Sequence, residues 1–149
     1  MTTYAVPFRL PTSTRARKAS AFNDRAEVQW FGLTGRFSDP TDAVIHLCKT
    51  GAGAVGGGGT AALNGGLIAA GFDAAAVLAG LGHYDSDVVV TLDLSVRFLR
   101  LAHVDLASEF VARVVKSTRT LAFVEGELRN GTRATDPPFA KLTAMVGPI

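Results

Sequence analysis

Residues 64–80 read NGGLIAAGFDAAAVLAG, an almost wholly apolar run with a single charged residue, Asp73. An apolar segment of this length and composition predicts a helix, and a helix that is hydrophobic on every side is a buried one. Gly80 and Gly82 predict where that helix ends. The run therefore predicts a long central helix enclosed by the rest of the chain.

Two features of this helix point to chemistry. An ionised carboxylate at the middle of a buried helix costs about 2 kcal/mol or more unless partners or a task hold it there, which makes Asp73 the leading catalytic candidate. The alternatives are an aspartate that faces solvent and a structural, partnered aspartate. At the head of the helix, Gly65 and Gly66 would leave the first backbone amides uncovered, and such amides bind anions or developing negative charge.

The segment that precedes the helix predicts one short helix and a hairpin. Residues 1–21 are expected to form an N-terminal arm with a short helix. This helix is predicted to begin at residue 12 or 13 and to run toward residue 27. Strands are predicted at 28–37 and 43–49, joined by a turn, and a glycine-rich loop covers 51–59.

The segment after the helix changes period. From residue 87 to residue 100, apolar side chains occupy every second position, which predicts a long strand with one buried face. The residues of that face are Val88, Val90, Leu92, Leu94, Val96 and Phe98. Three more strands are predicted at 104–116, 120–129 and 139–146, and short connections favour antiparallel neighbours. The order of elements predicts one α+β domain over residues 1–149, an antiparallel sheet wrapped around the central helix.

Composition narrows the class of protein. Apolar residues make up 48% and charged residues 19% of the chain, as in folded proteins, and the net charge of +2 does not call for a nucleic-acid partner. The single cysteine, Cys48, and the absence of a leader-like N-terminus indicate a reducing, cytoplasmic setting. The apolar run approaches the length of a membrane span, but Asp73 near its midpoint and several glycines argue against one.

Other common sites are disfavoured. Residues 51–56 match GxGxxG, but no helix follows directly and no βαβ unit repeats, so a dinucleotide site is not expected. The chain has no GxSxG motif. The spacing of His46, His83 and His103 does not suit a metal site. We expect neither a metal nor a cofactor.

Three segments carry a resemblance to a known family. They are residues 64–73, VTLDLSVRFLRLA at 90–102 and LAFVEGEL at 121–128. Together they resemble the hotdog-fold acyl-CoA thioesterases of the phenylacetate-pathway (PaaI-like) type, over roughly residues 22–147. Members typically carry His-Gly-Gly and an acidic residue seven positions after the second glycine, the spacing of Gly66 and Asp73. The resemblance implies a hotdog fold and hydrolysis of an acyl-CoA to a carboxylic acid and free coenzyme A.

The resemblance also implies roles for individual residues. The amides of Gly65 and Gly66 would polarise the thioester carbonyl, and Asp73 would act as general base or as nucleophile. Gly66 and Asp73 lie about 10 Å apart along one helix, too far to act on one group. We therefore expect Gly66 of one subunit to face Asp73 of another in a homodimer or a dimer of dimers.

Two departures from the family pattern bear on activity. Asn64 replaces the usual histidine, and Gly58 replaces an amide side chain that many relatives carry six positions earlier. Asn64 could still donate a hydrogen bond. A non-catalytic, acyl-CoA-binding hotdog protein is therefore an alternative, and a hotdog hydratase or dehydratase is a weaker one because the central helix carries no histidine.

Several residues are candidates for contacts with the coenzyme A part or the acyl part of the substrate. Arg97 and Arg100, at the end of the long strand, are candidates for the phosphates of coenzyme A. Phe72 and Val77 would shape the acyl pocket, with Gly58 near it. We expect a small-molecule acyl-CoA partner and neither nucleic acid nor membrane.

Overall fold

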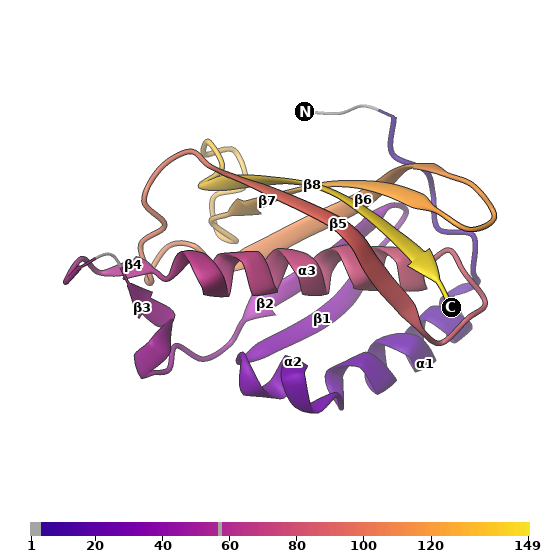
Figure 1. Cartoon of the computed structure of the whole chain (residues 1–149), viewed down its shortest axis with the longest axis horizontal. Helices are drawn as coiled ribbons and strands as arrows, with labels where there is room; N and C mark the ends of the chain where they lie inside the picture. Colours follow the sequence, from indigo (N-terminus) through magenta and orange to yellow (C-terminus); the bar gives the residue numbers. More distant parts are fainter. Residues whose placement is uncertain (1–3, 57) are drawn as a thin grey trace.

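Six antiparallel strands curl around helix α3 (Gly65–Leu81) in the computed structural model, which describes residues 4–56 and 58–149 (Figure 1). The strands are β1 (Leu33–Ser38), β2 (Asp42–Leu47), β5 (Val89–Phe98), β6 (Glu109–Ser117), β7 (Ala122–Arg129) and β8 (Ala140–Pro148). Their order in the sheet is β1-β2-β6-β7-β8-β5, so β1 and β5 are its edges. The predicted α+β class, with an antiparallel sheet around a central helix, is confirmed.

Helix α3 packs against the sheet through its apolar side chains. Phe72 is completely buried, and its ring meets that of Phe110 on β6 edge to face, with centroids 5.3 Å apart. The opposite strip of the helix is only partly covered, because Ala69, Ala70 and Asp73 are half-buried. The expectation of a helix enclosed on every side is therefore wrong for this strip.

The N-terminal region differs from the prediction at one point. Instead of one helix and a strand from residue 28, the chain forms α1 (Thr12–Asn23) and α2 (Ala26–Trp30) before β1 begins. The Asn23 side chain exchanges two hydrogen bonds with the backbone of Gly35, at 2.7 and 2.9 Å, which fixes the end of α1 against β1. Val28 is buried and Trp30 faces outward, a spacing that fits one helical turn as well as a strand.

Strand β5 contains a bulge that the alternation could not show. The register with β8 shifts between Thr91 and Asp93, so Leu92 is the extra residue and its side chain is 57% exposed. Before the bulge, Val89 is the buried residue, and Leu94 and Val96 pack against the core after it. The predicted buried face is thus correct for Leu94 and Val96, whereas Val88, Leu92 and Phe98 are exposed.

Two further segments differ from the predicted elements. Strand β6 begins at Glu109, whereas the prediction began at residue 104. The predicted glycine-rich loop holds a 3-10 turn, η1 (Ala52–Ala54), and two short strands, β3 (Val55–Gly56) and β4 (Ala62–Leu63), which pair with each other. Among the described residues, no helix is both long and apolar enough to span a membrane.

Candidate functional site

The N-terminus of α3 is capped by its own flanking residue. The Asn64 side chain accepts a hydrogen bond from the Gly66 amide at 2.7 Å, as asparagine commonly does at this position. The expectation that Gly66 leaves its amide uncovered is therefore wrong. Within residues 4–56 and 58–149, the Gly65 amide makes no hydrogen bond, and neither does the Asn64 side-chain NH₂ group. These N–H groups are the donors that this end of the helix can offer to a ligand.

Asp73 lies two helical turns further along α3, half-buried beside β5. Its Oδ1 atom accepts a hydrogen bond from the Thr91 hydroxyl at 2.5 Å. An ionised carboxylate has further acceptor sites on both oxygens, and no second hydrogen bond to Asp73 is formed by the part of the chain that the structure describes. Thr91 thus holds the carboxylate while leaving it able to bind water or attack a carbonyl.

Thr91 is the residue that sequence reasoning missed. It lies one position before the bulge, on the face that the alternation assigned to solvent. No signal in the sequence distinguishes Thr91, because it is one of several polar residues, with Asp93, Ser95 and Arg97, that alternate with apolar ones in this strand.

A small cavity of about 90 Å³ adjoins Asp73, with room for water. It lies between α2 and α3, and Asp73, Val77 and Phe31 are among the residues that line it. Asp73 and Val77, one helical turn apart on α3, both line this cavity.

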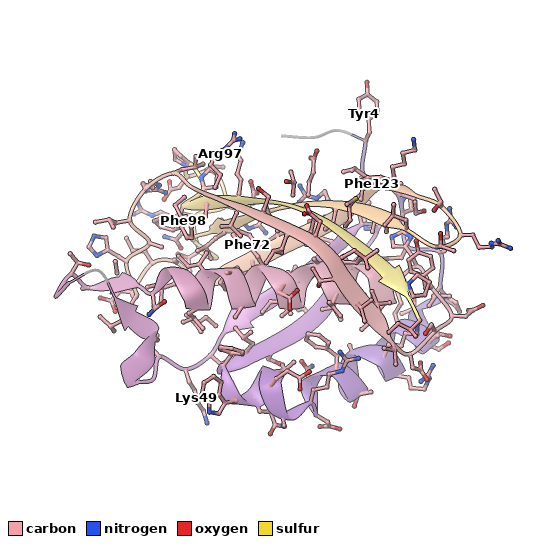
Figure 2. The ribbon with its side chains drawn as sticks, viewed as in Figure 1. Tyr4, Lys49, Phe72, Arg97, Phe98 and Phe123 are labelled. Carbon is pink, nitrogen blue, oxygen red and sulfur yellow. The ribbon has the colours of Figure 1, made fainter. Side chains whose placement is uncertain are left out.

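A second, larger groove of about 620 Å³ opens at the N-terminus of α3. Asn64 and Gly66 lie on its wall, and Phe31 lines both this groove and the small cavity. In Figure 2, Lys49 lies at the end of the molecule where α2 and the first two strands meet, and Lys49 also lines the groove.

The remaining predicted residues are placed apart. Phe72 points into the core and lines neither cavity. Gly58 is exposed with a φ of 63°, a conformation that favours glycine, and it does not line the groove.

The two candidate arginines line different cavities. Arg97 lines a groove on the outer face of the sheet and points away from α3 (Figure 2). Arg100 lies with its guanidinium 4.1 Å from the centroid of the Phe139 ring and donates a hydrogen bond to the Pro137 carbonyl. Arg100 and Gly65 line one cavity of about 440 Å³, so the structure groups Arg100, but not Arg97, with the helix N-terminus.

The spacing of the two candidate groups is preserved in the structure. Gly66 and Asp73 stand on one helix seven residues apart, which is about 10 Å along its axis and nearly the same helix face. A single chain therefore does not bring them to one reacting group. No cluster of histidine, cysteine and acidic side chains suited to a metal ion occurs among the described residues.

The geometry agrees with the comparisons to known proteins. The thioesterase superfamily model matches residues 61–136, just over half of the chain, and this chain belongs to that superfamily. The comparison with curated protein sequences found no match.

Solved structures show the same fold. PaaI of E. coli, from the phenylacetic acid degradation operon, is 17% identical with a TM-score of 0.73, covering 93% of this chain and 95% of that chain. A thioesterase family protein of Silicibacter pomeroyi is 20% identical with a TM-score of 0.72, covering 89% and 96%. Zebra fish thioesterase superfamily member 2 is 20% identical with a TM-score of 0.69, covering 91% and 96%.

These findings confirm the hotdog fold and the resemblance to PaaI-like thioesterases. Membership of the superfamily supports thioester hydrolysis as the general class of reaction. At such low identities, the likeness to the solved structures shows only that the fold is shared.

Proposed function

We propose that this protein hydrolyses acyl-CoA thioesters, with Asp73 as the group that activates water or attacks the carbonyl carbon. The observation that carries the proposal is the half-buried Asp73 carboxylate, held by Thr91 on the partly covered strip of α3. A carboxylate that is oriented by one hydrogen bond and still has free acceptor sites suits either role.

The thioester carbonyl would be polarised at the N-terminus of α3. Because the Gly66 amide is engaged by Asn64, the donors in this arrangement are the Gly65 amide and the Asn64 NH₂ group. Asn64 would then act in two ways, since its oxygen caps the helix while its nitrogen faces the ligand. If the Asn64 side chain changed its rotamer and broke this hydrogen bond, the Gly66 amide could also donate to the carbonyl oxygen.

Asp73 could bring about hydrolysis by either of two routes. As general base, Asp73 takes a proton from water, the water oxygen adds to the carbonyl carbon, the carbon–sulfur bond breaks, and the coenzyme A thiolate receives the proton. As nucleophile, a carboxylate oxygen adds to the carbonyl carbon and the thiolate leaves. Water then cleaves the resulting anhydride, which releases the carboxylic acid, regenerates the Asp73 carboxylate and yields the proton that the thiolate takes up. The protein's own residues supply the reacting groups in either route, and coenzyme A enters as part of the substrate.

A homodimer would complete the site. If two copies of α3 pack antiparallel about a two-fold axis between Ala69 and Ala70, Gly66 of one lies opposite Asp73 of the other. The axis falls midway between residues 66 and 73, and the alanines there would allow close approach of the helices. Beside this strip, β5 is an unpaired sheet edge, and Phe98 near its end is exposed (Figure 2).

The test is release of free thiol from a panel of acyl-CoA thioesters. We expect Asp73→Asn to lower kcat by roughly 10²- to 10⁴-fold, because the amide can neither accept a proton nor attack the carbonyl. The matched control is Asp93→Asn, at an exposed position of β5, the strand that also carries Thr91. This variant should keep full turnover. Full turnover by Asp73→Asn would show that the assigned mechanism is wrong.

One observation favours the alternative of an acyl-CoA-binding protein without turnover. The hydrogen bond from Gly66 to Asn64 removes one amide from the donors that would stabilise an oxyanion. This alternative predicts saturable binding of acyl-CoA in calorimetry together with no thiol release by the wild-type protein, the opposite of the result expected for an enzyme.

A further inference from the structure

The groove of about 620 Å³ at the N-terminus of α3 is built mainly from apolar and glycine residues. It is lined by Gln29, Trp30, Phe31, Gly32, Lys49, Gly51, Gly53, Ala54, Asn64, Gly66 and Leu67. Its volume falls in the range of small-molecule sites, which are mostly apolar with a few polar groups that fix orientation.

Trp30 is the distinctive side chain of this groove. It is the single tryptophan of the chain, and it is 81% exposed. Helix α2 buries Val28, and Trp30, two positions later, therefore faces outward. Its ring meets Phe31 edge to face, with centroids 4.9 Å apart, so the two rings support each other. A large aromatic surface held in place and left uncovered beside a groove is typical of a binding surface.

Glycine keeps part of the groove free of side chains. At Gly51 and Gly53, a Cβ atom would meet no other atom within 4 Å, so open space adjoins the backbone there. Gly32 has a φ of 72°, and a Cβ atom there would lie 2.7 Å from the Lys49 carbonyl oxygen, so the close approach of β1 and β2 at this end requires glycine.

The groove adjoins the proposed catalytic site at Asn64, whose NH₂ group is one of the proposed donors. Asn64 and Gly66, at the end where the thioester carbonyl would be held, also line the groove. A group attached to that carbonyl could extend along Leu67 and Phe31 toward Trp30 without crossing the core. The pantetheine arm would leave in the other direction.

We infer that this groove receives the acyl group of the thioester and that Trp30 selects large apolar acyl groups over acetyl. This inference rests on the proposed function and specifies its substrate class. Aryl and medium-chain aliphatic acyl groups share the required chemistry, because both present apolar surface to an indole ring.

The first test compares kcat/KM for phenylacetyl-CoA, octanoyl-CoA and acetyl-CoA. We expect Trp30→Ala to lower the preference for a large acyl group over acetyl about tenfold, and Trp30→Phe to lower it less. A loss limited to phenylacetyl-CoA would identify an aryl substrate, and a loss for both would identify apolar acyl groups in general. The control is Tyr4→Ala, an equally exposed aromatic residue far from the groove (Figure 2), which should leave the preference unchanged.

A second variant adds a side chain at Gly53, which lines the groove. Gly53→Leu places a side chain in open space and should reduce kcat/KM for octanoyl-CoA more than for acetyl-CoA. An unchanged preference in both Trp30→Ala and Gly53→Leu would overturn the inference. A change in the oligomer mass of Trp30→Ala, measured by light scattering, would also overturn it, because the groove would then hold a partner subunit.

A third measurement separates this inference from the proposed function. Tryptophan fluorescence, excited at a wavelength that the two tyrosines do not absorb, reports Trp30 alone. Titration with the uncleavable thioether S-octyl-CoA should therefore give a saturable change in this emission that coenzyme A does not give. That change without thiol release from any acyl-CoA would support the groove and refute the hydrolase. Thiol release without any emission change would refute the groove and leave the hydrolase standing.

Discussion

At the scale of single residues, the site depends on which atom each polar side chain uses. The Asn64 oxygen is committed to the Gly66 amide, which turns its nitrogen into the available donor. Thr91 donates to one oxygen of Asp73 and so orients the carboxylate. A histidine in place of Asn64 would present a ring instead of a carboxamide, so the departure from the family pattern changes the donor and not only its strength.

Another residue, His83, makes the stability of the fold depend on pH. It follows the end of α3, is 4% exposed, and neither ring nitrogen has a hydrogen-bond partner among the described residues. Its ring packs against Phe8 with centroids 5.6 Å apart. Burial, assisted by the charges of Arg9 and Arg15, lowers the pKa of His83 from 6.5 to about 4.

The sign of this effect follows from proton uptake. Between pH 6.5 and about 4 the unfolded chain binds a proton at His83 that the folded chain does not, so the free energy of unfolding falls as the pH falls through this window. We expect a loss of roughly 2–3 kcal/mol, measured by urea denaturation at about pH 7.5 and about pH 4.5. His83→Phe should reduce this difference, whereas His103→Gln, at an exposed position, should not. An undiminished difference in His83→Phe would assign the pH dependence to other groups.

At the scale of elements, the bulge in β5 positions the site. By adding Leu92 to the strand, it lets Thr91 face α3 before the bulge and Leu94 face the core after it. A regular strand with Leu94 and Val96 inward would turn Thr91 outward and leave Asp73 without its hydrogen-bond donor.

The packing of α3 on the sheet gives a prediction at the same scale. A Cβ atom at Gly71 would lie 2.3–2.6 Å from ring atoms of Phe110, which is completely buried and cannot move aside. Alanine favours a helix by up to about 1 kcal/mol over glycine, but overpacking of a core costs about 1–3 kcal/mol, so we expect a net loss of stability in Gly71→Ala. The midpoint of urea denaturation measures it. Gly53→Ala, where a Cβ atom meets open space, is the control and should shift that midpoint little.

At the scale of the whole molecule, the proposed mechanism requires a second copy of the chain, because Gly66 and Asp73 of one chain lie too far apart to act on one group. Gly66 and Asp73 occupy one partly covered strip of α3, and the free edge of β5 lies next to it. Exposed apolar side chains of the segment that leaves β5 continue this surface, namely Phe98, Leu99 and Leu101. Apolar surface beside an unpaired strand edge favours association with a second copy.

Shared sites can be tested by mixing Asn64→Ala and Asp73→Asn, provided that each variant by itself releases little thiol. If Asn64 of one subunit acts with Asp73 of the other, each mixed dimer of Asn64→Ala and Asp73→Asn contains one site with both native residues. Random reassembly from equal amounts should then restore about a quarter of wild-type thiol release. If both residues of one chain served the same site, every site would keep one defect and no activity would return. Wild-type protein taken through the same unfolding and refolding provides the reference.

The sequence by itself determined the central helix, the antiparallel strands that follow it, the hotdog resemblance and the choice of Asp73. The helix, the strands and the choice of Asp73 depend on hydrophobic periodicity and on an isolated charge, which are local properties that a short window of sequence records. The hotdog resemblance depends instead on the spacing of Gly66 and Asp73 and on the strand segments that follow them. Tertiary structure alone decided the break between α1 and α2, the bulge at Leu92, the hydrogen bond from Thr91 to Asp73 and the groove beside Trp30. Each of these depends on which distant segments meet, because register and side-chain partners are set by contacts between strands and helices far apart in the chain.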